Sequence, residues 1–445
     1  MIDYTLPLDR LPDPLPIEPL TKPFDVTITP PGSKSITCRA YVLAALAEGE
    51  SQIIGPLRAD DTDALLGALC TLGAEARWDG DNVRINGVGG RFPRGGHVNL
   101  GDGGAPTRFM IAAACLAAEP VVVDASPRMR QRPIAEGIDM LRQLGAKIEY
   151  AEQEGRLPVR VVPSKDFVGG ELEIGTTTSS QFVSALMLIA PFTERGVVLT
   201  YAQDPTSASY IELSRCVLGD WGIKHLAIRR FWRFGRVIAD RIDSRPPNRQ
   251  EYTVEADASS AAYWLTAVAI NLHTHMEIRG LGHPWSRSQP DIKFCLTVQN
   301  AGMYMEPWPW GIDAANLGVL KCPDCDAAGL PDASLAVAIL AACSETSSTV
   351  TGLHTLRHKE TDRIAALANE LRRIGCTVET TDDSITIDPS TRHDEPVVIE
   401  TYNDHRMAMA FAVLGLARPG ISIKNPACVS KSYPTFWKDF AKLYQ

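Results

Sequence analysis

The segment PGSKSITCRAYVLAALAEG, residues 31–49, shows the pattern that decides the fold, because five further segments repeat it. Each segment has a few small or polar residues followed by an alanine-rich stretch that is apolar on nearly every side. The other five are GDGGAPTRFMIAAACLAA (101–118), TTTSSQFVSALMLIAPF (176–192), EADASSAAYWLTAVAI (255–270), LPDASLAVAILAACS (330–344) and YNDHRMAMAFAVLGLA (402–417). A helix that is apolar all round is a buried helix, so the pattern predicts six buried helices.

The six copies are evenly spaced along the chain. Markers at their polar starts are separated by 72, 73, 77, 75 and 73 residues, and these markers are Ser35, Thr107, Ser180, Asp257, Asp332 and His405. Such a regular period indicates repeated structural units rather than chance similarity. Because the 445 residues exceed the ~250–300 at which one hydrophobic core stops growing, we expect the six units to divide three and three between two domains.

Amphipathic helices that end at a glycine lie between the buried ones. The clearest are LRQLGAKIEY around Gly145 and ELRRIGCTVET around Gly375, and weaker copies surround Gly73, Gly222 and Gly302. Glycine at a helix end followed by alternating apolar residues marks a helix stop and a strand start. Each unit therefore mixes helices with strands, and the expected fold class is α/β (α+β).

Two proline-containing stretches are the candidate crossovers between the domains: Pro30–Gly32 and SRPPNRQEY (244–252). They predict one domain over residues 33–253 and a second over residues 1–32 plus 254–445.

The final helix, PTFWKDFAKLYQ, has an apolar face that holds Phe436, Phe440 and Leu443. The strand that the sixth unit still needs would fall beyond residue 445. We expect FDVTITP (24–30), in which Val26 and Ile28 alternate with polar residues, to supply it. Both chain ends would then lie in the second domain.

The composition excludes several classes of protein. Fifty-three acidic residues against 44 basic ones give a net charge of −9, whereas a general nucleic-acid binder needs a basic surface. The first residues, MIDYTLPLDR, match neither a signal peptide nor a transit peptide, and no run of ~18 apolar residues predicts a membrane span. Ten scattered cysteines are typical of reduced thiols. We therefore expect a cytoplasmic protein that binds neither nucleic acid nor membrane.

Basic residues gather near the helix starts, although the chain as a whole is acidic. They are Lys34 and Arg39 at the first start, Arg108 at the second, Arg406 at the sixth, Arg128, Arg130 and Arg132 in SPRMRQRP, Lys359 and Arg363 in RHKETDR, and Lys431 in CVSKSYP. Helix starts carry partial positive charge and bind anions. A small substrate with several negative charges fits this arrangement. Capping of backbone N–H groups by itself accounts for Asp257 and Asp332.

Other motif readings fit less well. PPGSKS lacks the glycines of a P-loop, GDGG has proline at 106 where a dinucleotide motif needs glycine, and no GxSxG elbow occurs. Cys322 and Cys325 with His354 and His358 resemble a zinc site, but the gap of 28 residues between the pairs exceeds the usual ~12–15. We therefore expect no metal.

Eight short motifs resemble those of one family. In chain order, PGSKSITCRA, PRMRQRP, SSQF, DASSAAY, LPDAS, KETDRI, YNDHRMAM and SKSYPTF are similar to motifs of the 5-enolpyruvylshikimate-3-phosphate synthase family, from about Pro30 to the C-terminus. The resemblance implies two domains, each of three βαβαββ units, with buried helices that point to an interdomain cleft (an inside-out α/β barrel). It implies transfer of the enolpyruvyl group of phosphoenolpyruvate to the 5-hydroxyl of shikimate 3-phosphate, by a monomer without a cofactor. This reaction belongs to the shikimate pathway of aromatic amino acid biosynthesis.

The resemblance also implies roles for individual residues. Asp332 matches the proton acceptor, and Glu360 and Lys34 share the proton transfers. Contacts with shikimate 3-phosphate carry over to Lys34, Ser35, Arg39, Ser179, Ser180, Gln181, Ser207, Asp332 and Lys359. Contacts with phosphoenolpyruvate carry over to Lys34, Gly104, Arg128, Gln181, Arg363, Arg406 and Lys431.

The chain departs from the family pattern at several positions. The usual Asn-(Ala/Ser)-Gly-Thr loop reads Asp102-Gly103-Gly104-Ala105-Pro106, Thr355 stands where Asn or Glu is usual, and SRSQPDIKF (286–294) replaces SxQGDxxF. An acid at position 102 should weaken the binding of an anion unless it points away or pairs with a cation such as Arg108. We therefore expect weaker inhibition by glyphosate, which competes with phosphoenolpyruvate in this family.

Two alternatives stay open, the first because of these departures and the second because it shares the fold. One is a divergent paralogue that is non-catalytic or has another substrate. The other is the sister transferase that acts on UDP-N-acetylglucosamine, which carries a mobile-loop cysteine, whereas no cysteine lies between Ser126 and Ala146 here.

Overall fold

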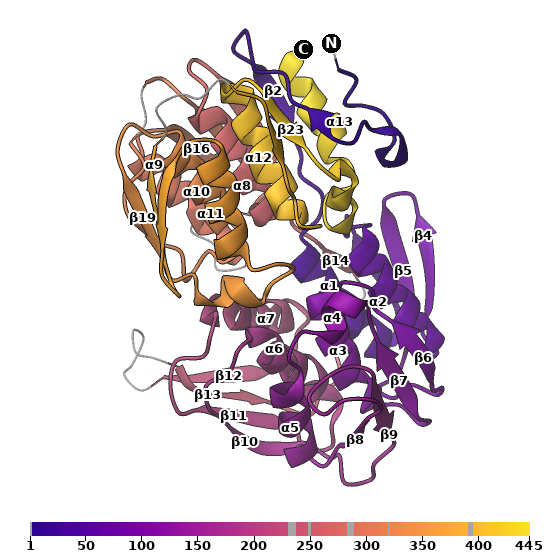
Figure 1. Cartoon of the computed structure of the whole chain (residues 1–445). Helices are drawn as coiled ribbons and strands as arrows, with labels where there is room; N and C mark the ends of the chain where they lie inside the picture. Colours follow the sequence, from indigo (N-terminus) through magenta and orange to yellow (C-terminus); the bar gives the residue numbers. More distant parts are fainter. Residues whose placement is uncertain (1, 230–236, 248–250, 283–288, 319–320, 390–394) are drawn as a thin grey trace. The chain divides into compact units, whose positions relative to one another are not determined.

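The computed structural model describes residues 2–229, 237–247, 251–282, 289–318, 321–389 and 395–445 (Figure 1). Contacts divide the chain into an inserted domain, Gly32–Val254, and a terminal domain, Met1–Pro31 with Glu255–Gln445. The ranges expected from the sequence differ from these by one residue at each crossover. Residues 248–250 of the second crossover lie outside the described residues.

In the described part of the inserted domain, three four-stranded sheets share one strand order. The first two strands of each sheet are parallel, and the remaining neighbours are antiparallel. The sheets are β14 (Glu251–Thr253), β3 (Glu48–Ile54), β5 (Asn82–Val88) and β4 (Glu75–Asp79); β6 (Gly96–Asn99), β7 (Val121–Asp124), β9 (Val159–Val162) and β8 (Lys147–Tyr150); and β10 (Gly170–Ile174), β11 (Val197–Tyr201), β13 (Val237–Ile242) and β12 (His225–Arg229).

The core of the inserted domain is built on the buried helices of the repeat. These are α1 (Lys34–Leu46), α3 (Gly104–Ala114) and α6 (Ser180–Ile189), and they contact one another. Burial on every side matches their apolar, alanine-rich sequences. The other helices of this domain are α2 (Asp60–Thr71), α4 (Pro127–Arg130), α5 (Ala135–Gln143), η2 (Ala190–Phe192) and α7 (Ala208–Asp220).

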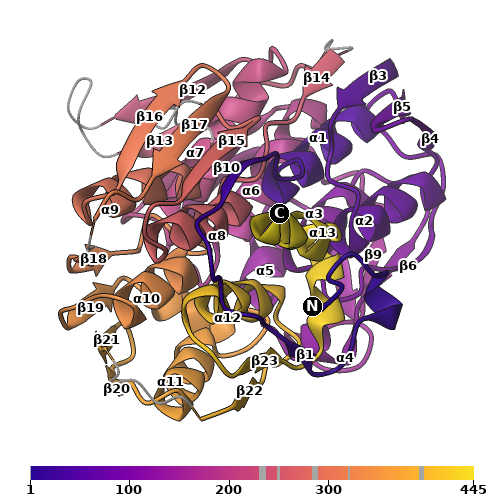
Figure 2. The same cartoon turned by 90° about the horizontal axis from the view of Figure 1, so that it is seen from above.

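The terminal domain repeats this plan. Its sheets are β2 (Asp25–Ile28), β15 (His275–Arg279), β17 (Gly311–Ala315) and β16 (Tyr304–Trp308); β18 (Cys325–Asp326), β19 (Ser348–Thr351), β21 (Ile385–Asp388) and β20 (Thr377–Thr380); and β1 (Leu15–Pro16), β23 (Ile421–Ile423) and β22 (Val397–Ile399). Its helices are η1 (Leu8–Arg10), α8 (Ala258–Ala269), η3 (Pro290–Lys293), α9 (Phe294–Asn300), α10 (Ser334–Ala342), η4 (His354–His358), α11 (Arg363–Arg373), α12 (His405–Ala417), η5 (Pro426–Lys431), α13 (Phe436–Ala441) and η6 (Lys442–Tyr444). The buried helices α8, α10 and α12 contact one another and lie together in both views (Figures 1 and 2).

The mixed α/β fold of repeated βαβαββ units is therefore confirmed. Each buried helix of the repeat is followed by a strand, an amphipathic helix and, in five of the six copies, a β-hairpin within the described residues. The direction of the buried helices toward an interdomain cleft stays a prediction from the resemblance.

The glycine stops lie where the sequence predicts them. Helix α5 ends at Gln143, Gly145 follows with φ 96°, and β8 begins at Lys147. A Cβ on residue 145 would also come within 2.1 Å of the carbonyl oxygen of Asp166. Only glycine meets both requirements without strain, because it lacks a Cβ and tolerates positive φ.

The prediction that Val26 and Ile28 complete the sixth unit is wrong. Their strand, β2, pairs in parallel with β15 and completes the fourth unit, with Val26 opposite Met276. The sixth unit instead takes β1, in which Leu15 lies opposite Ile423 in antiparallel register. Alternating apolar residues specify a half-buried strand but not its partner, which is decided by the sheet edge that the chain reaches before it crosses at Pro31.

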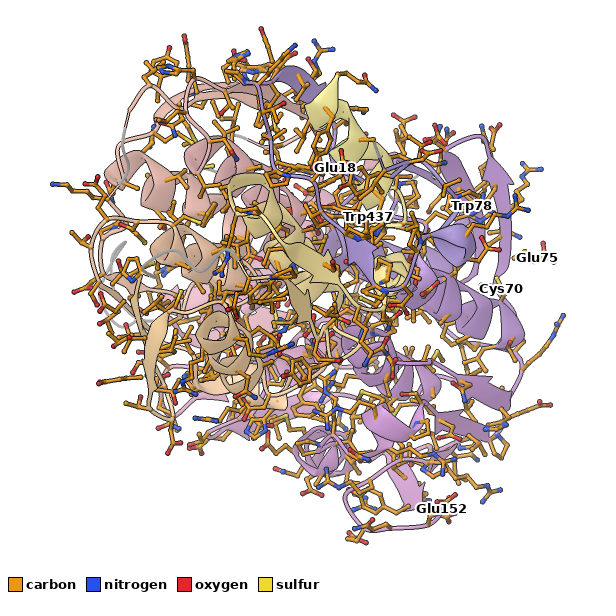
Figure 3. All side chains as sticks on the ribbon, turned by 45° about the horizontal axis from the view of Figure 1, so that its top comes forward. Glu18, Cys70, Glu75, Trp78, Glu152 and Trp437 are labelled. Atoms are coloured by element: carbon orange, nitrogen blue, oxygen red, sulfur yellow. The ribbon has the colours of Figure 1, made fainter. Side chains whose placement is uncertain are left out.

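The final helix packs on the other end of the chain. Phe436, Phe440 and Leu443 are buried, as their spacing predicts. The ring of Tyr4 lies 5.2 Å from that of Phe440 and 6.2 Å from that of Trp437. Glu18, labelled in Figure 3, accepts a 2.5 Å hydrogen bond through its carbonyl oxygen from the hydroxyl of Tyr444. The two ends of the chain therefore stabilise each other within the terminal domain.

Candidate functional site

In the inserted domain, the start of α1 carries the first predicted site residues. Lys34 is the first residue of the helix, and its Nζ donates to Oδ2 of Asp61 at 3.0 Å. The Lys34 side chain is 16% exposed, and that of Asp61 is 4% exposed. Ser35 follows it and is half-buried. Asp61 was not singled out in the sequence, although an acid in the first turn of α2 is a common helix-start signal.

Arg39 joins three helices of the inserted domain. Its guanidinium donates to Ser214 Oγ at 2.9 Å on α7 and to Ser184 Oγ at 3.1 Å on α6, and it also bonds the Ser35 carbonyl oxygen at 2.8 Å on α1. Burial lowers the pKa of Arg39 to about 10, a value at which the side chain is still charged at neutral pH. The bonds give Arg39 a structural role, and its contact with shikimate 3-phosphate stays a prediction.

Arg108 connects the segments to which the resemblance assigns phosphoenolpyruvate. Its Nη1 donates to the Gly104 carbonyl oxygen and to Gln181 Oε1, each at 3.0 Å. Its Nη2 donates to the carbonyl oxygen of Pro133 at 3.3 Å. One buried side chain therefore holds the start of α3, the start of α6 and the segment after α4 in fixed relation.

The unusual acid at position 102 bonds a hydroxyl group. The Asp102 carboxylate accepts a hydrogen bond from Ser126 Oγ, which in turn accepts from the Met129 N–H at 3.2 Å and caps α4. Arg128, on the same short helix, is exposed, and its Nη1 donates to Gln131 Oε1 at 3.2 Å. Asp102 thus helps to place the helix that carries Arg128.

Three of the four serines assigned to shikimate 3-phosphate, together with the glutamine, stand at the starts of α6 and α7. Ser179 caps α6, because its Oγ accepts from the Gln181 N–H at 3.3 Å, and Ser180 is buried behind it. Ser207 precedes α7 and has left-handed backbone angles, φ 49° and ψ 49°. Hydroxyl and N–H groups at a helix start suit a phosphate group.

In the terminal domain, three cations converge on one carboxylate. Oδ1 of Asp332 accepts from Lys359 Nζ at 3.3 Å and from Arg363 Nη1 at 3.0 Å, while Oδ2 accepts from Arg406 Nη2 at 3.1 Å. These side chains come from the segment before α10 and from the starts of α11 and α12.

The expectation that Asp332 caps a buried helix is wrong. Helix α10 starts at Ser334 after Ala333, and no side chain caps it. Instead the carboxylate of Asp332 faces cations. Capping by Asp257 is confirmed, since its Oδ1 accepts from the Ser260 N–H at 2.7 Å at the start of α8.

Two further acids belong to the same cluster. Arg363 donates to Asp404 through Nε at 2.8 Å and through Nη2 at 3.2 Å, and Nη2 also reaches Glu360 Oε2 at 3.0 Å. Lys431 Nζ lies 3.1 Å from Glu360 Oε1. We call Lys359, Arg363, Arg406 and Lys431 the cation cluster. Asp404 was missed in the sequence, where its only signal is its place directly before a buried helix.

The charges of this cluster set the protonation of its members. Burial alone would raise the pKa of Asp332, but Arg406, Lys359 and Arg363 outweigh it and hold the pKa well below the usual range. Burial lowers the pKa of Arg363, but Asp404, Glu360 and Asp332 outweigh that effect and raise it. Asp332 is therefore ionised and Arg363 is charged at neutral pH. A bound anion would share the cations with Asp332 and make it a stronger base.

Three further expectations from the sequence concern positions that depart from the family pattern, metal binding and membrane spans. Thr355 lies in η4 and is 9% exposed. Residues 286–288 of SRSQPDIKF lie outside the described residues. Within the described ranges, no group of three or more His, Cys, Asp or Glu residues is arranged to hold a metal ion, and no helix is long and apolar enough to cross a membrane.

Comparison with known proteins gives consistent results. A family model described as EPSP synthase (3-phosphoshikimate 1-carboxyvinyltransferase) matches residues 20–440. A 3-phosphoshikimate 1-carboxyvinyltransferase of Methanosphaerula palustris is 38% identical over 424 residues, which cover 94% of this chain and 97% of that protein. The protein of the same name from Citrobacter koseri is 36% identical over 435 residues, covering 96% and 98%.

Solved structures agree with the fold. An EPSP synthase from Acinetobacter baumannii matches with a TM-score of 0.80 at 23% identity, over 96% of this chain and 98% of that chain. The enolpyruvyl transferase NikO from Streptomyces tendae matches with a TM-score of 0.72 at 16% identity, over 96% of each chain. The family model and the relatives, each spanning nearly the whole sequence, show that this chain belongs to the EPSP synthase (3-phosphoshikimate 1-carboxyvinyltransferase) family.

Proposed function

We propose that this chain transfers the enolpyruvyl group of phosphoenolpyruvate to the 5-hydroxyl of shikimate 3-phosphate and releases phosphate. The observation that carries the proposal is the convergence of Lys359, Arg363 and Arg406 on the Asp332 carboxylate. Phosphoenolpyruvate holds a carboxylate and a phosphate in a small volume, so it needs several cations close together, and the reaction needs a base. The cation cluster and Asp332 provide both kinds of group.

The reaction divides into an addition with two proton transfers and an elimination in which a third proton leaves with phosphate. The 5-hydroxyl loses its proton to Asp332 as its oxygen attacks the phosphate-bearing carbon of phosphoenolpyruvate. Carbon 3 gains a proton, for which Glu360 and Lys34 share the transfer. The tetrahedral intermediate then loses a proton from carbon 3, which is now a methyl group, as the bond between carbon 2 and the phosphate oxygen breaks. This elimination forms the enolpyruvyl double bond and releases phosphate, and cations stabilise the negative charge that develops.

Binding of the two substrates divides among the predicted residues. Phosphoenolpyruvate takes Arg363, Arg406 and Lys431 of the cation cluster, together with Lys34, Gly104, Arg128 and Gln181. Shikimate 3-phosphate takes Ser179, Ser180, Gln181 and Ser207, together with Lys34, Ser35, Arg39, Asp332 and Lys359. Supporting this division, the Ser179–Gln181 segment stands at the start of a buried helix, where N–H groups favour a phosphate.

A phosphate-release assay tests the proposed function. We expect release only when both substrates are present, and none when UDP-N-acetylglucosamine replaces shikimate 3-phosphate. Asp332→Asn should slow release by about 10²–10⁴-fold, whereas Asp81→Asn, which changes an exposed carboxylate, should leave it unchanged. Turnover with UDP-N-acetylglucosamine, or no turnover with either acceptor, would refute the proposal.

The proposal includes a cytoplasmic monomer that needs no cofactor or metal. Supporting a reducing compartment, none of the ten cysteines, all of which the structure describes, is in a disulfide. Equilibrium sedimentation checks the oligomeric state, and activity after exhaustive chelation checks the metal requirement.

A further inference from the structure

Asp291 is a buried carboxylate that the proposed reaction does not use. It lies in η3, between β15 and α9, and is 1% exposed. It accepts hydrogen bonds from the Ser259 hydroxyl on α8 and, through Oδ1 at 3.3 Å, from the N–H of Ala333. Among the residues that the structure describes, it forms no ion pair.

Burial of such a carboxylate in its charged form is unfavourable in free energy. A charged carboxylate without a cation partner costs several kcal/mol in a protein interior, and two hydrogen bonds offset only part of this. Burial and then the charge of Asp332 raise the pKa of Asp291 to about 6, with Asp257 acting in the same direction, while Arg406 and Ser259 oppose the rise. At pH 7 to 8 the group is therefore mostly ionised in spite of its surroundings.

The position of Asp291 relates it to the proposed base. Ala333, whose N–H it accepts, is the residue directly after Asp332 and precedes α10. Besides burial, the charged groups that most affect the pKa of Asp332 are Arg406, Lys359 and Arg363, which lower it, and Glu360, which raises it. The negative charge of Asp291 thus acts on the Asp332 carboxylate, whose other close neighbours are mostly cations.

We propose that Asp291 is a positioning residue for Asp332: it anchors the turn that presents Asp332, and its negative charge sustains the ability of that carboxylate to accept a proton. The physical reason is that three cations weaken Asp332 as a base, and a neighbouring like charge strengthens it. A stronger base accepts the hydroxyl proton more readily. This inference rests on the proposed role of Asp332 as proton acceptor.

The test is the pH dependence of kcat/KM for the parent and for Asp291→Asn. Asparagine keeps both bonds, since its oxygen accepts from Ala333 and its amide donates to Ser259. At pH 8 we expect the variant to be about tenfold slower, the effect of one pKa unit on a base. At pH 5, where Asp291 of the parent is itself protonated, the two enzymes should be nearly equal.

A purely structural role gives a different result. The proposal is overturned if the ratio of parental to variant kcat/KM is the same at pH 5 and pH 8, or if the variant has the parental kcat/KM at both pH values. Because substrate titrations affect both enzymes equally, they cancel from this ratio.

Ser259→Ala provides a second test should Asp291→Asn fail to fold. It removes a bond that favours the ionised form of Asp291 but keeps its charge. We expect the acid-side fall in kcat/KM to move to higher pH, with the parental value recovered near pH 9. An unmoved midpoint would overturn the proposal.

The inference and the proposed function fail in distinguishable ways. Asp332→Asn with parental activity would refute Asp332 as the base, whatever Asp291 does. An inactive Asp332→Asn together with a pH-independent effect of Asp291→Asn would refute only the role of Asp291.

Discussion

The guanidinium group of Arg132 lies directly against Gly104, with Nη1 2.7 Å from the point where a Cβ on residue 104 would stand. Real Cβ atoms essentially never approach another heavy atom closer than 3.0 Å. Arg132 is 8% exposed and belongs to the PRMRQRP segment, which also carries Arg128. A side chain at position 104 would therefore have to push the Arg132 guanidinium group aside, before any ligand binds.

Gly104→Ala should act through Arg132. The added methyl group displaces the guanidinium and with it the segment that carries Arg128, so we expect KM for phosphoenolpyruvate to rise about tenfold, with a smaller change in kcat. The control is a double-mutant cycle with Arg132→Lys. Because lysine lacks the guanidinium group, Gly104→Ala should raise KM for phosphoenolpyruvate less in the Arg132→Lys background than in the parent. Strictly additive effects would show that the methyl group acts by another route.

Asp332→Asn should separate catalysis from folding. The amide cannot accept the hydroxyl proton, so we expect kcat to fall by about 10²–10⁴-fold. The fold should survive, because α10 takes no cap from this side chain, although Arg363 and Arg406 lose a counter-charge. Urea unfolding together with kcat measures both effects. Loss of the cooperative transition would instead assign Asp332 a structural role.

Asp291→Asn should also change stability, with a defined dependence on pH. A folded-state pKa of about 6 against an ordinary value of 3.8 means that the folded protein binds this proton more tightly than the unfolded chain does. The ionised group therefore lowers the free energy of unfolding of the parent above pH 6, and this destabilisation disappears as the pH falls toward 3.8.

We accordingly expect the variant to be more stable than the parent at pH 8 by up to about 3 kcal/mol, and equal to it near pH 4. Urea unfolding of both proteins at several pH values measures the difference. A difference in stability that is constant from pH 4 to pH 8 would contradict the raised pKa of the buried Asp291 carboxylate.

The loop at residues 102–106 should set the response to glyphosate. Asp102 places a negative charge near the start of α3, where an anionic inhibitor would bind, and its bond to Ser126 fixes its position. Converting Asp102 to Asn and Ala105 to Thr together should therefore lower the ratio of the inhibition constant to KM for phosphoenolpyruvate. Pro106 is left unchanged, because proline is tolerated in the first turn of a helix. If the ratio stays the same, another part of the site controls the inhibitor.

The sequence by itself determined the repeated units and their local boundaries. Period and composition predicted the six buried helices, and Gly145 and Gly375 marked helix ends, because burial on all sides and positive φ leave direct traces in residue type. The motifs also identified the family and the candidate residues Lys34, Asp332 and Glu360.

Only the tertiary structure decided which distant groups meet. No periodicity in the sequence predicts that β2 pairs with β15, and none predicts that the Arg132 guanidinium group lies against Gly104. The same holds for Asp332, which had the pattern of a helix cap but faces Lys359, Arg363 and Arg406, the last of them 74 residues away. The physical reason is that helix and strand signals are local, whereas strand pairing and buried ion pairs depend on which segments packing brings together.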